Sequence, residues 1–216
     1  MPTLANIAKI NGIVISGAAA PTDRHILLGT QTASSSATLS FSGLTSHRSD
    51  VLRSSFDVLE FRLDNMHPAN DNVDFGFQVN ATDGADYNDS PITSTVFEAR
   101  HRPNNTGARS IVYEAGSDQA QGTAYQKMSR VNSNANNAST SGSLRLYSPS
   151  STTYVKHFIS ETNFLHSAAA AGDRYSINFS VAGYINDTTA IDEISFMFSS
   201  GNIDAGEIKM YGIAKA

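Results

Sequence analysis

The sequence predicts an all-β protein: an antiparallel two-sheet β-sandwich with jelly-roll topology and a short N-terminal arm. Apolar and polar residues alternate with period two in about ten segments, which is the pattern of half-buried strands. Clusters of Asn, Asp, Gly, Ser and Pro separate these segments and indicate turns. Charged residues make up only 16% of the 216 residues, and helical periodicity is nearly absent. Together these observations favour a β-protein with many turns.

The alternating segments run through most of the chain. In LEFRL, Leu59, Phe61 and Leu63 lie on one face of the expected strand, while Glu60 and Arg62 lie on the other. One apolar and one polar face per strand imply antiparallel sheets that pack on each other through their apolar faces. Eight or more such strands with long connections favour a jelly roll. The other segments with this pattern are residues 37–43, 73–79, 95–101, 109–114, 142–148, 155–160, 175–181 and 194–198.

The segment SSGNIDAGEIKMYGI, residues 199–213, predicts a hairpin that closes the fold. An alternating strand precedes it, a turn is expected between Gly201 and Gly206, and a second alternating strand follows. In that second strand, Ile208 and Met210 are expected to return to the core. The last strand is expected to pair deep inside a sheet.

Residues 1–23 differ in character from the rest and predict an attachment arm, followed by a jelly-roll domain over residues 24–216. The alanine-rich end of the arm resembles a signal peptide. However, Lys9 lies late and Asn11 interrupts the apolar part, so an arm that stays in the mature protein is favoured. The apolar residues expected to make the attachment contacts are Leu4, Ile7, Ile10, Ile13, Val14 and Ile15.

Composition argues against several kinds of site. Cysteine is absent, which excludes disulfides and thiolate metal sites. The net charge of −5 and the lack of a basic cluster argue against a nucleic-acid partner, and no apolar run approaches the roughly 20 residues of a membrane span. Known catalytic and nucleotide-binding motifs are missing, and the six histidines lack metal-ligand spacing. We therefore expect no enzymatic activity, no cofactor, no bound metal, no nucleic acid and no membrane partner.

Two glutamates in expected strands, Glu60 and Glu98, are the candidates for the carboxylate pair of a glycosidase. Each is followed two residues later by an arginine, Arg62 or Arg100. Solvated ion pairs are therefore the favoured interpretation. A secreted lectin or glycan hydrolase remains a third hypothesis for the whole protein.

Two acidic loops, residues 70–74 and 83–89, carry oxygen atoms that calcium could use. Asn and Asp in such loops commonly bond to nearby backbone instead, so ordinary turns are favoured. The second loop also places a tyrosine among short polar residues, as saccharide- or protein-contact loops do. With residues 130–142, the loop over residues 80–92 is a candidate ligand contact. Its candidate residues are Asp83, Asp86, Tyr87, Asn88 and Asp89.

The C-terminal text ISFMFSSGNIDAGEIKMYGI resembles the ending of a jelly-roll module that is common in structural proteins of tailed bacteriophages. Residues 39–66 and 73–89 are similar to the early strands and the open loop of that module. NIAKINGI, residues 6–13, is similar to a short opening of phage virion proteins. The likeness covers roughly residues 24–216. Its specific carriers are Ser199, Ser200, Gly201, Asn202, Gly206, Tyr211, Gly212 and Ile213.

The resemblance implies a structural protein located in the virion. Such modules form tail fibres, receptor-binding tips or cement proteins that decorate heads, and they are usually homotrimers. A single module behind a short arm, without heptad repeats, is expected to be a decoration protein that binds the assembled head through its arm and sandwich. The alternative is a tail-fibre or receptor-binding module. The expected partners are the major capsid protein or tail proteins, further copies of the chain and, in the alternative, a host surface polysaccharide or protein.

Overall fold

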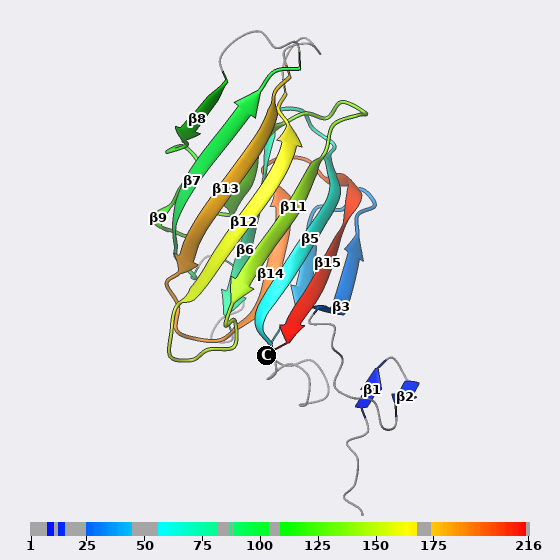
Figure 1. Ribbon diagram of the computed structural model, residues 1–216, viewed down its shortest axis with the longest axis vertical. Helices are drawn as coiled ribbons and strands as arrows, with labels where there is room; N and C mark the ends of the chain where they lie inside the picture. The colour runs from blue at the N-terminus through cyan, green and yellow to red at the C-terminus, as the bar shows by residue number, and fades with distance from the viewer. Residues whose placement is uncertain are drawn as a thin grey trace, which may run out of the picture.

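Figure 1 shows the computed structural model, which describes residues 8–10, 13–15, 25–44, 56–81, 87, 89–103, 109–167 and 174–214. Within these residues the chain forms no helix, and so none that could cross a membrane. The strands are β1 Ala8–Ile10, β2 Ile13–Ile15, β3 His25–Thr32, β4 Leu39–Ser42, β5 Phe56–Pro68, β6 Val73–Ala81, β7 Ile92–His101, β8 Ser110–Tyr113, β9 Ala120–Gly122, β10 Gln126–Asn132, β11 Thr140–Tyr147, β12 Lys156–Leu165, β13 Ser176–Ile185, β14 Ile191–Phe198 and β15 Ile203–Ala214.

Two antiparallel sheets form the body of the protein. The large sheet has nine strands in the order β3-β15-β5-β11-β12-β13-β7-β8, with β9 also pairing with β7. The small sheet has the order β10-β6-β14-β4, while β1 and β2 pair with each other in a separate two-stranded sheet. Figure 1 looks onto the outer face of the large sheet, with the small sheet behind it. The predicted all-β, antiparallel β-sandwich is confirmed.

The strand order is that of a jelly roll with one enlarged step. In an eight-stranded jelly roll, strands one, eight, three and six form one sheet, and strands two, seven, four and five form the other. With β4 counted as strand one, the small sheet β4-β14-β6-β10 matches the first set. The large sheet matches the second set when the meander β11-β12-β13 takes the place of strand seven. Beyond β5, the strands β15 and β3 widen this sheet further.

The prediction of a closing hairpin is wrong, because its two strands lie in different sheets. β14 lies in the small sheet, whereas β15 lies inside the large sheet between β3 and β5. The connection over residues 199–202 crosses between the sheets, and Ser199 anchors it: its amide donates to the Asp74 carbonyl at 2.7 Å, and its hydroxyl accepts from the Asp74 amide at 3.0 Å. Gly206 does not end a turn. It lies within β15 at a φ of 123°, close to the backbone of β5, where a side chain would clash.

The inner faces of the two sheets enclose the apolar core. The alternation predicted for β5 is observed, since Leu59, Phe61 and Leu63 are buried and Arg62 is exposed. Ile208 and Met210 of β15 are buried too, although their strand pairs elsewhere than expected. Side chains of the same strands that point away from the small sheet form the broad outer face.

Phenylalanine rings fill the centre of the core. Phe196 of β14 is fully buried and lies among aromatic rings contributed by both sheets. Its centroid distances to them range from 5.5 to 6.5 Å, within the range of favourable aromatic pairs. The neighbouring rings are Phe41, Phe61, Phe75 and Phe77.

Candidate functional site

The predicted attachment arm is described only in part. Leu4 and Ile7 lie outside the described residues. The backbone of the remaining candidates forms the β1–β2 hairpin, in which Ile10 pairs with Ile13 and Lys9 pairs with Val14. Within the described chain this hairpin pairs with no strand of the sandwich, and Figure 1 draws it apart from both sheets. Ile15, the last of the candidate attachment residues, pairs with Ala8.

Two of the predicted ligand-loop residues are described, and Asp83, Asp86 and Asn88 lie outside the described residues. Tyr87 is half-buried, with its ring 6.5 Å from that of Tyr125. Burial, together with the nearby Glu193 carboxylate, raises the pKa of the Tyr87 phenol well above its usual value. Its hydroxyl is buried. Asp89 is exposed.

The first acidic loop uses its carboxylates to hold neighbouring backbone. Asp71 accepts hydrogen bonds from the Asn134 amide at 3.1 Å and from the Ser167 hydroxyl at 2.7 Å. Asp74 accepts one from the Val131 amide at 2.9 Å. The partners lie 57 to 96 residues away in the sequence, so these bonds tie the loop to other segments of the chain and not to its own turn. Across the residues that the structure describes, no three His, Asp or Glu side chains gather in a way that could hold a metal ion.

The two strand glutamates do not form a carboxylate pair. Glu60 points outward from β5, whereas Glu98 points inward from β7 toward the small sheet. Their strands are four positions apart in the large sheet, which corresponds to about 19 Å at the usual strand spacing. Glycosidases need their two carboxyl groups about 5 to 10 Å apart and facing one site. These glutamates therefore cannot act together on one glycosidic bond.

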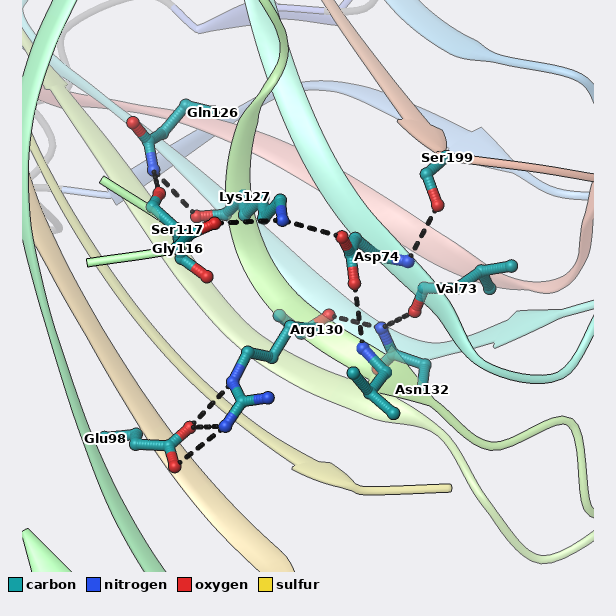
Figure 2. A network of polar contacts seen from close by, with 12 residues as sticks. Val73, Asp74, Glu98, Gly116, Ser117, Gln126, Lys127, Arg130, Asn132 and Ser199 are labelled. Atoms are coloured by element: carbon teal, nitrogen blue, oxygen red, sulfur yellow. Dashed lines mark hydrogen bonds and ion pairs between the residues drawn. The ribbon is translucent and has the colours of Figure 1, made fainter. Parts of the chain in front are cut away.

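Glu98 forms a buried ion pair that joins the two sheets, which corrects the expectation of a solvated pair. Figure 2 shows Arg130 of β10 reaching across to it. The guanidinium donates from Nε to Oε2 at 2.9 Å and from Nη2 to Oε1 at 3.0 Å, and Nη2 also lies 3.3 Å from Glu114. Arg100, the predicted partner, is 3.5 Å away. Because the Glu98 side chain is fully buried, this pair is a structural link and not a solvent-facing site.

Glu60 is likewise buried, although it lies on the outer face. Arg62 and Arg145 cover it and donate from their Nε atoms at 2.7 and 2.8 Å. Burial raises the pKa of the Glu60 carboxyl, but the hydrogen bonds and charges of the two arginines outweigh burial and hold the pKa below its usual value. The expectation of a solvated pair is wrong here too, because sequence spacing showed Arg62 but not Arg145.

Replacing Glu60 with Gln is expected to weaken the dependence of stability on acid pH. A folded-state pKa below the ordinary value of 4.5 means that the carboxylate stabilises the fold at neutral pH. This contribution is lost as the pH falls through the folded-state pKa. Thermal unfolding of both proteins between neutral and acid pH measures the difference. Glu161→Gln, at an exposed glutamate of β12, is the matched control. A wild-type curve identical to that of Glu60→Gln would contradict the assignment.

An apolar patch lies on the outer face at the edge of the large sheet. Ile111, Phe97 and Tyr113 are 80%, 49% and 48% exposed. Phe97 pairs with Tyr113, and their rings meet edge to face at 5.4 Å, while Ile111 pairs with Ala99 one step along. Paired residues share a face, so the three side chains form one surface, here called the edge patch. Contiguous exposed apolar groups of this kind mark sites of protein contact.

Sequence reasoning missed the edge patch for a physical reason. The alternation in RSIVYE correctly predicted a strand, and β8 spans Ser110–Tyr113. However, alternation says only that Ile111 and Tyr113 share a face. It does not say that β8 lies at the end of the sheet, where Ile111 and Tyr113 are left exposed by the described part of the chain.

No family model, no curated protein and no solved structure matches this chain. The assignment of function therefore depends on the geometry described above and on the resemblance noted in the sequence. The geometry offers a jelly-roll body, an apolar edge patch and a separate N-terminal hairpin.

Proposed function

We propose that this chain is a non-enzymatic structural protein of a bacteriophage particle that decorates the assembled head. The edge patch carries the proposal, because three large exposed apolar side chains on one rigid sheet edge are suited to burial against another protein. The jelly-roll sandwich and the phage-like C-terminal segment are in keeping with this role.

The N-terminal hairpin and the edge patch would have different roles in binding the head. The N-terminal hairpin, with Ile13 and Ile15 in β2, would anchor the protein on the head lattice, as an added strand or in a groove. The edge patch would close the contact with the major capsid protein or with another copy of the chain. Because the decoration protein binds only the assembled shell, its binding stabilises the shell by mass action.

Deletion of residues 1–20 is expected to abolish incorporation into particles without unfolding the domain. The sandwich should persist because β3 begins at His25, and β1–β2 pairs with no other described strand. Particles assembled with the truncated protein are purified, and bound copies are counted by quantitative mass spectrometry. Normal occupancy by the truncated protein would overturn the anchoring role of the arm.

The edge patch is tested in the same assay. Ile111→Asp is expected to reduce occupancy strongly, since it places a charge in an apolar contact. Ile159→Asp is the matched control, because Ile159 is also exposed on the outer face but lies on β12, away from the patch. Equal occupancy of the two variants would contradict a contact through the edge patch.

The number of copies per particle distinguishes a location on the head from a location on the tail. A count matching the capsomers places the protein on the head, and a count matching one tail ring places it on the tail.

A further inference from the structure

A row of aromatic side chains crosses three adjacent strands on the outer face of the large sheet. Tyr147 on β11 lies beside His157 on β12, one step beyond the last paired residues of those strands. His157 pairs with Tyr184 on β13, and their ring centroids are 6.2 Å apart. His157 is exposed and both tyrosines are half-buried. With adjacent strands about 4.8 Å apart, the row extends for about 10 Å.

The aromatic row borders an open depression of about 520 Å³. Tyr147 and His157 form one side, and Tyr154, which is 73% exposed, rises from the connection between β11 and β12. That connection is ordered by Ser151, whose hydroxyl accepts hydrogen bonds from the amides of Thr153 and Tyr154 at 3.2 and 3.0 Å. Three aromatic side chains therefore line the depression.

A buried lysine holds a further segment that lines the depression. This segment is the connection between β13 and β14, which contributes Thr188. Lys156 is fully buried, and its ammonium donates to the backbone carbonyls of Asp187, at 3.0 Å, and Thr189. These bonds fix the backbone on both sides of Thr188. The Lys156 ammonium is therefore bound to backbone carbonyls inside the protein, and Lys156 is not among the residues that line the depression.

The far end of the aromatic row continues into a cluster of neutral polar groups. Thr93 pairs with Tyr184 across β7 and β13. Its hydroxyl accepts from the backbone amide of Gln121 at 3.2 Å and from the Gln121 side chain at 2.6 Å. The side-chain oxygen of Gln121 accepts a hydrogen bond from the side-chain amide of Asn186 at 2.6 Å. Gln121 adopts a φ of 55°, a conformation that is uncommon for residues other than Gly and persists where surrounding contacts hold it.

This cluster retains hydrogen-bonding capacity toward solvent. The Thr93 hydroxyl accepts two bonds and keeps its own proton to donate. Among the described residues, no hydrogen bond is formed by the side-chain carbonyl oxygen of Asn186, and the Tyr184 hydroxyl meets Gln121 only at 3.5 Å. Donors and acceptors are thus presented in a fixed arrangement beside the aromatic row.

From these contacts we propose that the aromatic row, the depression and the polar cluster form a binding strip for a neutral oligosaccharide. Sugar rings present a face of C–H bonds that packs on aromatic rings, and hydroxyl groups at their rim that pair with amides and hydroxyls. No Asp, Glu, Lys or Arg side chain lines the depression in the described part of the chain, so charge does not select the ligand. The strip goes beyond the proposed role in the virion, and it does not depend on that role.

The test uses the full-length protein and four neutral hexasaccharides built from glucose, galactose, mannose and N-acetylglucosamine. Ligand-detected saturation-transfer NMR at millimolar sugar is expected to show binding of at least one of them. His157→Ala and Tyr154→Ala, both at exposed positions, should each weaken that binding by about tenfold. Tyr184→Phe keeps the ring and should weaken it less. Tyr113→Ala, an exposed tyrosine in the edge patch, should leave it unchanged.

Three results would overturn the binding strip. These are no saturation transfer to any of the four sugars, equal binding by the wild type and the His157→Ala and Tyr154→Ala variants, or preferential binding of an oligogalacturonate, which carries negative charge. Loss of binding in Tyr113→Ala together with the strip variants would also contradict the location. Failure of the protein to enter particles would not affect this test, because the sugar is measured on the isolated protein.

Discussion

Replacing Phe196 with Ala is expected to lower the free energy of unfolding by about 3–5 kcal/mol, the range for removal of a buried aromatic side chain. Phe196 is fully buried, and its ring contacts four other phenylalanines from strands of both sheets. The cavity left behind removes packing from both layers at once, and a core of β-strands can collapse only partly around it. Urea denaturation at neutral pH measures the change.

Phe97→Ala is the matched control, since Phe97 is 49% exposed on the outer face of the same protein. Its loss is expected to cost less than about 1 kcal/mol, as is usual for surface positions. The Phe196 variant should also unfold at a temperature lower by about 6–20 °C. If the two variants were equally stable, the assignment of Phe196 to the centre of the sandwich would be wrong.

Replacing Arg130 with Met is expected to lower the free energy of unfolding by about 3–5 kcal/mol, the cost of breaking one partner out of a buried ion pair. The side chain of Glu98 is fully buried, and Arg130 gives it two hydrogen bonds at 2.9 and 3.0 Å. Without the guanidinium, a carboxylate would remain in the interior with Arg100 3.5 Å away. The expected loss of stability therefore comes mainly from leaving the Glu98 carboxylate buried without its main partner, and less from the lost attraction between the two charges.

A second substitution tests that explanation. Arg130→Met combined with Glu98→Leu removes both charges, and apolar replacements of buried ion pairs are often neutral or stabilising. The double variant should therefore recover most of the lost stability in the same urea measurement. Lys209→Met, which breaks the surface pair with Glu207, should change stability little. A double variant as unstable as Arg130→Met would contradict the explanation.

Local pattern was sufficient to identify the apolar face of strands such as β5 and β6. β5 and β6 contain Leu59, Phe61, Phe75 and Phe77 at alternating positions, and all four are buried. β10 shows where this pattern stops being informative: its buried residues include Gln126, whose side chain is fully buried and hydrogen bonded to Ser94, Ser117 and Lys127. In β10 the buried polar groups interrupt the alternation in polarity, so the pattern does not reveal the buried face.

The candidate sites depended on pairing between distant segments. The sequence showed an arginine two residues after each glutamate, but the decisive partners are Arg145 and Arg130, 85 and 32 residues away from Glu60 and Glu98. In the same way, Tyr147, His157 and Tyr184 come from three separate strands and share a face only through their register. Neither arrangement has a signature in any short window of sequence.

The sequence alone therefore determined the fold class, because period-two alternation is a local consequence of strand geometry and of the burial of apolar side chains. It also identified much of the core, including Ile208 and Met210. Only the tertiary structure decided which sheet each strand joins, which face of each sheet stays open and which charges meet. These features depend on strand order and register, which are set by contacts between residues far apart in the chain, and on a second layer that covers one face and leaves the other in water.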